Sequence, residues 1–272
     1  MNPNKYFIIL PPNFIFYMTL TSLIYKALYW YINTVDKKKE IIFMNYGYHD
    51  TNENIKLQSK DEVNRYSIQL YNRLAKMVDI KDKSIVEIGC GRGGGIAYIT
   101  EYFKPKKALG VDLDAKAAKF GNTHYQLKGL SFKQGNAHKL EFEDKSVDVI
   151  LNVESSHRYG NMEKFVKEVY RCLKPGGSFL YTDFRYSDKM DELNLLLAKF
   201  DFVKFDEQMI NNQVLKALEL DAERRIALVE KHAPLFLSKY LHDFAGSTDS
   251  PTFNDIKSGR IIYYVYCFHK PL

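Results

Sequence analysis

The stretch that decides the fold runs from Ile85 to Asp114, with IVEIGCGRGGG at 85–95 and GVDLD at 110–114. An apolar run ends at the carboxylate Glu87, and a glycine-rich loop follows it. A second apolar run ends at Asp112. Glycines let backbone N–H groups approach a ligand closely, and an acid after the second strand binds a ribose diol in many α/β proteins. This layout predicts a site for a nucleotide-like cofactor.

Apolar runs and helical patterns alternate along the rest of the chain. We expect strands at 84–88, 108–111, 130–134, 147–153 and 178–182, and helices at 96–103, 115–127 and 162–173. We also expect a strand-like run at 41–48, a helix at 61–77, a strand at 202–205, a mostly helical region at 211–245 with a break at Pro234, and an aromatic strand at 260–268. Such alternation is typical of a parallel sheet with helices on both faces.

Composition narrows the class of protein. With 272 residues, 46% of them apolar, the chain can form one sizeable core, or a core plus a cap. The net charge of +6 is spread out, so we expect no nucleic-acid partner. The cysteines Cys90, Cys172 and Cys267 have no metal-ligand spacing, so we expect no metal site and a reducing, cytoplasmic location. The 20 tyrosines and 18 phenylalanines fit either core packing or an aromatic pocket for an apolar substrate.

The N-terminal segment Tyr6–Tyr25 carries no charge and approaches the length of about 20 apolar residues that a membrane span needs. Pro11 and Pro12 interrupt it, and no clear signal-peptide pattern is present. Three interpretations stay open: a membrane span, a peripheral membrane contact, or a helix packed over the catalytic domain. We therefore divide the chain into 1–45, an apolar cap or membrane-contacting segment, and 46–272, the catalytic domain. Monomer and homodimer both remain open.

Three features decide between cofactors, because Gly89-x-Gly91-x-x-Gly94 alone is a weak dinucleotide fingerprint. Glu87, two residues before the first glycine, favours a cationic amino-acid group over a pyrophosphate. Asn136, in a small turn after the third strand, offers an acceptor to an adenine amine. The pair SVDVI at 146–150 and LKPGG at 173–177 is foreign to hydride-transfer folds.

Together, EIGCGRGGG, GVDLD, GNA, FEDKSVDVI and LKPGGSF resemble the motifs of class I S-adenosylmethionine-dependent methyltransferases. The chain is similar in particular to the phthiotriolone and phenolphthiotriolone dimycocerosates O-methyltransferase branch, through FMNYGY at 43–48, EVNRYSIQLYN at 62–72 and NVESSHRY at 152–159. The resemblance covers roughly residues 25–270, so it implies nothing about the structure or role of the apolar N-terminus.

The resemblance implies an α/β fold: a Rossmann-like seven-stranded sheet with its last strand antiparallel, an N-terminal helical cap, and a helical lid at about 206–246. It implies S-adenosylmethionine as cofactor, at the carboxyl ends of the strands. The expected cofactor-binding residues are Tyr46, Glu87, Gly89, Cys90, Gly91, Asp112, Leu113, Asn136, Ala137 and Asn152.

Each part of the cofactor has its expected neighbours within this set. Glu87, Gly89 and Gly91 would hold the methionyl end, and Tyr46 would reach its carboxylate. Asp112 would hold the ribose, with Leu113, Asn136 and Ala137 around the adenine. Many relatives have Asp where Asn136 stands; Asn keeps the acceptor and loses the charge. Cys90 is read as a small apolar filler of the loop.

The sulfonium methyl is already activated, so the enzyme must align an acceptor oxygen and remove its proton. His157, just after the fourth strand, is the candidate base, since histidine has an ordinary pKa near 6.5; the alternative is a structural histidine. Glu154 would orient His157, bind substrate or cap a helix. His232, in the lid, would contact substrate or assist the base.

These observations lead to one preferred function and three alternatives. The preferred one is methyl transfer to a hydroxyl of an apolar lipid, polyketide or isoprenoid. The first alternative is C-methylation of the sterol or isoprenoid type, in which Glu154 would stabilise a carbocation. The second is a fold-sharing cyclase that binds S-adenosylmethionine without consuming it. A nicotinamide oxidoreductase is the third. Location is expected to be cytoplasmic, with membrane association open.

Overall fold

The computed structural model describes residues 31, 34, 36, 39–234 and 237–272. By contacts the chain divides into Met1–Lys39 and Glu40–Leu272, and the expected domain boundary after residue 45 stays a prediction. The apolar segment Tyr6–Tyr25, with the helical cap expected there, lies outside the described residues. In the part of the chain that is described, no helix has both the length and the apolar character of a membrane span.

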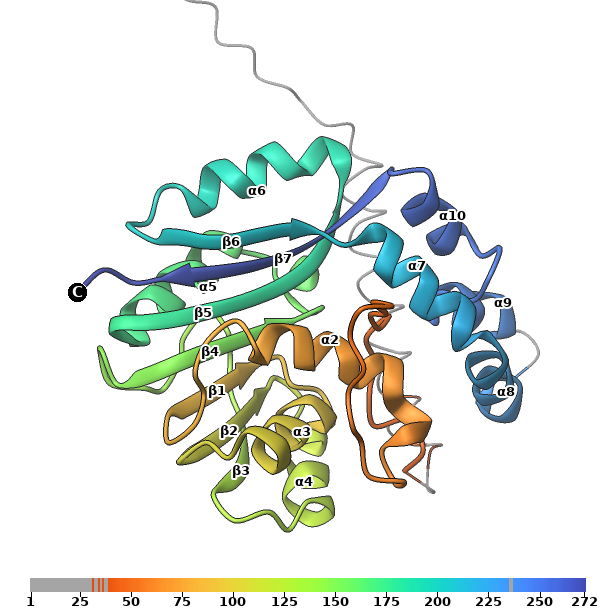
Figure 1. Ribbon diagram of the computed structural model, residues 1–272, viewed down its shortest axis with the longest axis horizontal. Helices are drawn as coiled ribbons and strands as arrows, with labels where there is room; N and C mark the ends of the chain where they lie inside the picture. The colour runs from red at the N-terminus through yellow and green to blue at the C-terminus, as the bar shows by residue number, and fades with distance from the viewer. Residues whose placement is uncertain (1–30, 32–33, 35, 37–38, 235–236) are drawn as a thin grey trace, which may run out of the picture. The chain divides into compact units, whose positions relative to one another are not determined.

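The unit Glu40–Leu272 is built on one seven-stranded sheet, with the strand order β3-β2-β1-β4-β5-β7-β6 (Figure 1). The strands are β1 (Ser84–Ile88), β2 (Lys107–Asp112), β3 (Leu130–Gln134), β4 (Val147–Val153), β5 (Leu173–Tyr186), β6 (Val203–Met209) and β7 (Ile261–His269). β7 runs antiparallel to both of its neighbours, β5 and β6, whereas β1 to β5 pair in parallel. The predicted Rossmann-like sheet with an antiparallel last strand is confirmed. Strand order reverses between β1 and β4, the place where open α/β sheets bind ligands.

Helices cover both faces of this sheet. The α-helices are α2 (Arg65–Ala75), α3 (Gly94–Phe103), α4 (Ala115–His124), α5 (Met162–Cys172), α6 (Met190–Leu197), α7 (Asn211–Leu220), α8 (Ala222–His232), α9 (Ser238–Phe244) and α10 (Pro251–Lys257), and the 3-10 turns are η1 (Glu62–Asn64), η2 (Ser156–Arg158) and η3 (Ser187–Lys189). Because strand side chains alternate between faces, Val265 of β7 packs into a core with α2, α3, α7 and α10, and Tyr266 packs into a second core with α5 and α6.

Two expectations for local structure are wrong. The segment 41–48 contains no strand; the carbonyl of Ile41 accepts from Arg92 Nη1 at 3.1 Å, and the amide of Tyr46 donates to the side chain of Glu154. Gly47 then turns the chain at φ +88°. The lid does not begin at residue 206, because β6 continues to Met209 and α7 begins at Asn211. The predicted break at Pro234 lies between α8 and α9.

Candidate active site

The glycine loop joins β1 to α3 in a form that only glycine permits at several positions. Gly89, Gly91 and Gly93 have φ values of +74°, +52° and +82°, a region that other residues rarely adopt. A Cβ atom added to Gly89 would lie 2.4 Å from Ser155 Oγ, and one added to Gly95 would lie 1.9 Å from the Tyr71 ring. The loop therefore packs closely against β4's continuation and α2.

Asp112, at the carboxyl end of β2, anchors this loop. Its Oδ2 accepts from Gly91 N at 2.7 Å and its Oδ1 accepts from Asp114 N at 2.9 Å. Burial raises the pKa of its carboxyl above the ordinary value, and these backbone hydrogen bonds oppose the rise. Leu113 beside it leaves 64% of its surface exposed. A carboxylate next to an exposed apolar side chain suits a ribose with an attached base.

The turn after β3 lies next to Asp112, because Gly135 N donates to Asp112 O at 2.8 Å. Asn136 is exposed and accepts from His138 N at 2.9 Å, and Ala137 is half-buried. The structure thus brings Asp112 and Asn136 to one edge of the sheet, as the sequence predicts. Their expected contacts with ribose and adenine stay predictions.

Two buried acceptor atoms lie on the neighbouring strands β1 and β4. Glu87 is fully buried; Tyr71 donates to its Oε1 at 2.7 Å, and its Oε2 has no hydrogen-bond partner among the described residues. Burial raises the pKa of Glu87 to about 8. Asn152 donates to Ile88 O at 2.8 Å, and its Oδ1 also lacks a partner within the described chain.

Unsatisfied buried acceptors cost about 1–3 kcal/mol each, so these two atoms fit a ligand that brings donors, such as an ammonium group. Together with Asp112, they suit a cofactor that has both a ribose and an amino-acid end. Cys90, in the same loop, is buried, and burial raises the pKa of its thiol well above the ordinary value. It is therefore a neutral thiol, in keeping with the role of filler.

His157 lies in η2, directly beyond β4, and is held by Asp183 near the end of β5. Its Nδ1 lies 2.7 Å from Asp183 Oδ1, and its backbone N–H donates to Asp183 Oδ2 at 2.9 Å. Asp183 also accepts from Ser156 Oγ at 2.6 Å and pairs with Arg185 Nη1 at 3.2 Å. The imidazole stacks on Phe184 with ring centroids 4.3 Å apart. Position and orientation of the ring are therefore fixed.

The protonation state of this pair follows from its surroundings. Burial alone would raise the pKa of Asp183, but the charges of His157 and Arg185 lower it below the ordinary value. Burial, with Arg158 and Arg185, lowers the pKa of His157 against the opposing effect of Asp183. At neutral pH an ionised Asp183 thus accepts from Nδ1–H, and Nε2 carries the lone pair. Arg158 Nε donates to this Nε2 at 3.0 Å.

Glu154, just after β4, is hydrogen-bonded to the backbone of Tyr46. It adopts φ +43°, which is uncommon for a residue other than glycine, and its Oε1 accepts from Tyr46 N at 2.8 Å. Burial raises the pKa of its carboxyl to about 8. Asp183, and not Glu154, makes the hydrogen bond that orients His157. The expected contact of Glu154 with substrate stays a prediction.

Tyr46 connects the site to helices α8 and α9. Its ring stacks on Phe184, with centroids 5.5 Å apart. The buried Arg225 of α8 donates to the carbonyls of Asn45 at 3.0 Å and Tyr46 at 3.1 Å, and to Ala245 O at 2.9 Å. The guanidinium of Arg225 therefore links helix α8 to the segment before Gly47 and to the end of α9.

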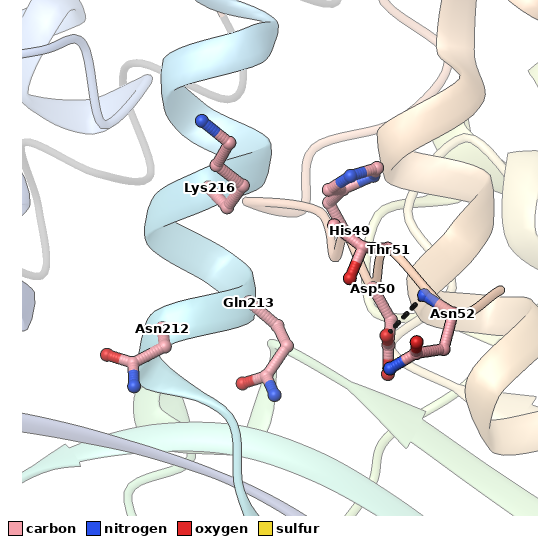
Figure 2. A pocket seen from close by; sticks show the side chains of 7 residues that line it. All are labelled: His49, Asp50, Thr51, Asn52, Asn212, Gln213 and Lys216. Atoms are coloured by element: carbon pink, nitrogen blue, oxygen red, sulfur yellow. Dashed lines mark hydrogen bonds between the residues drawn. The ribbon is translucent and has the colours of Figure 1, made fainter.

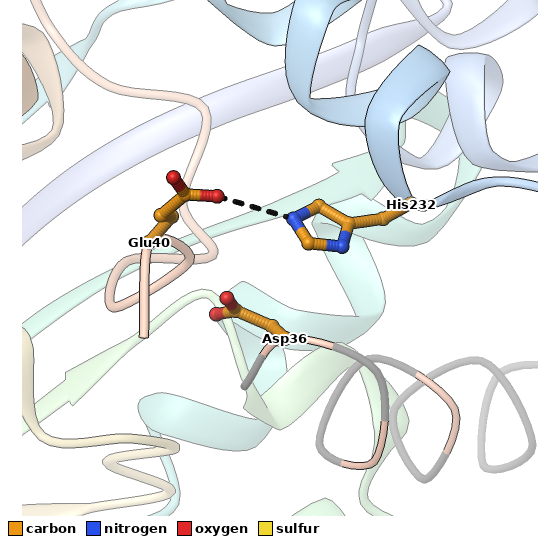
Figure 3. Close-up of side chains that lie close together, drawn as sticks. All are labelled: Asp36, Glu40 and His232. Carbon is orange, nitrogen blue, oxygen red and sulfur yellow. Dashed lines mark hydrogen bonds and ion pairs between the residues drawn. The ribbon is translucent and has the colours of Figure 1, made fainter. Parts of the chain in front are cut away.

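His232 ends α8 and faces Glu40, with Nε2 3.4 Å from Glu40 Oε2 (Figure 3). Lys231 pairs with the same carboxylate at 2.7 Å. The imidazole is thus close to a carboxylate. Its expected contact with substrate stays a prediction.

An open polar pocket lies between the segment after Gly47 and α7 (Figure 2). Its lining side chains are those of His49, Asp50, Thr51, Asn52, Asn212, Gln213 and Lys216. None of the predicted site residues lines it. The lining of this pocket therefore shares no residue with the predicted cofactor and base positions.

Asp183 and Arg185 are functional candidates that the sequence analysis misses. The signal was present: TDFR at 182–185 places a carboxylate at the end of a buried strand, as GVDLD does for Asp112. The strand was expected to end at Thr182, so the residues beyond it were not considered.

The strand order, the glycine loop and the acid after β2 define a Rossmann-like α/β enzyme that binds a nucleoside-bearing cofactor. The family model of a methyltransferase domain matches residues 86–181. The chain is 36% identical over 247 residues to a fatty-acid O-methyltransferase of Mycolicibacterium smegmatis, covering 90% of this chain and 89% of that protein. It is 36% identical over 232 residues to a phthiotriol/phenolphthiotriol dimycocerosates methyltransferase of Mycobacterium tuberculosis, covering 85% and 86%.

The chain therefore belongs to this family of S-adenosylmethionine-dependent methyltransferases. Among solved structures, the 4+2 cyclase SpnF matches with a TM-score of 0.68 at 15% identity, covering 93% of this chain and 95% of that one. The geranyl diphosphate C-methyltransferase of Streptomyces coelicolor, solved with S-adenosylhomocysteine, matches with a TM-score of 0.63 at 16% identity, covering 87% and 94%. At these identities the likeness shows a shared fold. The expected enzyme class and cofactor are confirmed, and the orphaned acceptors and Asp112 fit that cofactor.

Proposed function

We propose that this methyltransferase transfers the methyl group of S-adenosylmethionine to an oxygen atom of an apolar, lipid-like small molecule, and that His157 accepts the proton of a hydroxyl acceptor. The observation that carries the proposal is the Asp183–His157 pair at the carboxyl ends of β4 and β5. The names of the relatives, which act on fatty acids and on phthiotriol-type lipids, support the class of acceptor.

Bound S-adenosylmethionine supplies an activated methyl carbon, so the protein's task is to position the acceptor and remove a proton. Asp183 keeps a proton on Nδ1 of His157, so the lone pair is on Nε2, which becomes available to the acceptor's O–H when Arg158 Nε leaves it. As the hydroxyl oxygen bonds to the methyl carbon, the carbon–sulfur bond breaks with its electron pair staying on sulfur, and the hydroxyl proton moves to Nε2. The imidazolium that forms is stabilised by the ionised Asp183 beside it. Stacking on Phe184 holds the ring in place throughout.

The hydrogen bonding of Glu154 favours oxygen over carbon as the acceptor atom. A C-methylation that passes through a carbocation needs a negative group nearby. Oε1 of Glu154 already accepts from the Tyr46 amide at 2.8 Å, and burial raises the pKa of this carboxyl to about 8. The cyclase alternative rests on a shared fold alone.

His157→Gln tests the proposal directly. Loss of the base should lower kcat on a hydroxyl acceptor by about 10²–10⁴-fold, with the Kd for S-adenosylmethionine unchanged in calorimetry. The matched control is His124→Gln, on α4, which should leave kcat unchanged. Normal turnover in His157→Gln, or mass-spectrometric placement of the new methyl group on carbon, would refute the proposal.

A further inference from the structure

Three turns at the amino ends of β1, β2 and β3 carry an excess of positive charge. The segments 79–83, 104–107 and 125–129 contain six lysines and two aspartates, a net charge of +4 in a chain whose total is +6. All six lysines are exposed; they are Lys81, Lys83, Lys104, Lys106, Lys107 and Lys128. The positive excess of the chain is therefore less evenly spread than the sequence alone suggests.

Backbone hydrogen bonds place these turns side by side. Lys106 N donates to Lys83 O at 2.9 Å, which joins the first turn to the second, and Ala108 N donates to Gly129 O at 2.9 Å, which joins the second to the third. Because β1 to β4 are parallel, the amino ends of these strands lie at the edge of the sheet opposite the carboxyl ends that hold the candidate active site. The six lysines thus form one surface away from that site, which we call the lysine edge.

The acidic residues that flank the lysine edge are paired with other lysines. Asp148, which accepts from Ser84 N at 2.9 Å, lies 2.8 Å from Lys174 Nζ. Glu101, in the last turn of α3, lies 2.8 Å from Lys60 Nζ. Within the described part of the chain, no carboxylate oxygen lies within 4.0 Å of the Nζ atom of any of the six lysines. The excess charge of the lysine edge therefore faces solvent.

The composition of the lysine edge favours an extended anionic surface as partner. Its three segments contain no arginine, and none of the large hydrophobic side chains exposed on the described chain lies in them. Protein interfaces are enriched in aromatic residues and arginine and depleted in lysine, and binding of single-stranded nucleic acid uses aromatic side chains that stack on bases. A bilayer with anionic lipids requires only clustered positive charge close to its surface.

We propose that the lysine edge is a docking surface for bilayers that contain anionic lipids. The attraction between lysine side chains and such a surface falls off within a Debye length, which is about 8–10 Å at physiological salt. Because the lysine edge has no exposed apolar side chain to insert, docking is electrostatic and reversible. The opposite edge of the sheet, with the candidate active site, stays uncovered. Docking of this kind requires neither the proposed acceptor nor the proposed base.

Vesicle sedimentation of the full-length chain tests the lysine edge. Vesicles of phosphatidylcholine alone are compared with vesicles in which part of the lipid is phosphatidylglycerol. The edge variant replaces one lysine in each turn, as Lys83→Gln, Lys106→Gln and Lys128→Gln. The control variant loses the same charge from exposed lysines of α5 and α10, as Lys164→Gln, Lys167→Gln and Lys257→Gln.

Wild type should sediment with the anionic vesicles at low salt, remain in solution with the neutral ones, and be released by high salt. The edge variant should bind the anionic vesicles about 10–100-fold more weakly, and the control variant should stay within about threefold of wild type. Thermal unfolding, and turnover on an acceptor dispersed without vesicles, should be the same in wild type and both variants.

Several results would overturn the role of the lysine edge. These are wild type that binds no vesicles or binds neutral and anionic vesicles equally, an edge variant that binds as wild type does, and an equal loss in both variants. A double-stranded DNA fragment that wild type binds more tightly than the vesicles, with that affinity lost in the edge variant, would also overturn it. The partner would then be nucleic acid and not a bilayer.

Discussion

The site has two parts that are built in different ways: the proposed cofactor side, at the ends of β1, β2 and β3, and the proposed acceptor side, at the ends of β4 and β5. The first depends on backbone: glycines with positive φ, and amides that point to Asp112. The second depends on side chains: Asp183, His157, Phe184 and Arg158 hold one another. A site built from backbone atoms suits a ligand that stays the same among relatives, such as the cofactor. A site built from side chains can be altered by single substitutions, which suits an acceptor that differs among relatives.

Asp183→Asn should have the largest effect and should act on the acceptor side alone. The amide cannot stabilise an imidazolium, and it favours the wrong tautomer of His157, so kcat on a hydroxyl acceptor should fall by about 10²–10⁴-fold. Steady-state kinetics and calorimetry measure kcat and the Kd for S-adenosylmethionine. Asp188→Asn, an exposed residue of η3, is the control. A variant that loses cofactor affinity as strongly as turnover would mean that the two sides are not separable.

Asp112→Ala should act on the cofactor side. It removes the acceptor of Gly91 N and the predicted acceptor of the ribose hydroxyls, so the Kd for S-adenosylmethionine should rise by about 10–100-fold. At saturating cofactor, kcat should stay within a few-fold of wild type. Asp114→Ala, which removes the N-cap of α4, is the matched control. Unchanged affinity in Asp112→Ala would remove this residue from the cofactor site.

The pH dependence of kcat/KM should be the smallest of these effects. It tests the protonation state of His157 on the acceptor side. His157 acts as a base only when neutral, and its pKa is lowered from 6.5 by burial and by Arg158 and Arg185. The kcat/KM for a hydroxyl acceptor should therefore be constant at neutral pH and fall with decreasing pH only below 6.5. Asp183, with its still lower pKa, stays ionised through this range. An inflection above 6.5 would contradict the assigned state of His157.

The same contrast explains what the sequence could predict. β1 and β4 begin and end where the apolar runs do, because a buried parallel strand needs apolar residues on both faces. Gly89 and Asp112 were found because their roles depend on neighbours within about one βαβ unit. The segment 41–48 is not the predicted strand, since Ile41 O and Tyr46 N bond to side chains far along the chain. Asp183 was missed because only the pairing of β4 with β5 brings it to His157.

The peptide units around Tyr46 have a further consequence for the working cycle. Glu154 accepts the N–H of Tyr46, and Arg225 donates to its carbonyl. If α8 moved outward alone, the buried guanidinium of Arg225 and the carbonyl groups of Asn45 and Tyr46 would lose their hydrogen bonds to each other. This loss would cost several kcal/mol. Helix α8 and the segment around Tyr46 therefore move most readily as one unit. The same hydrogen bonds connect any movement of α8 to the carboxyl of Glu154 through the backbone of Tyr46.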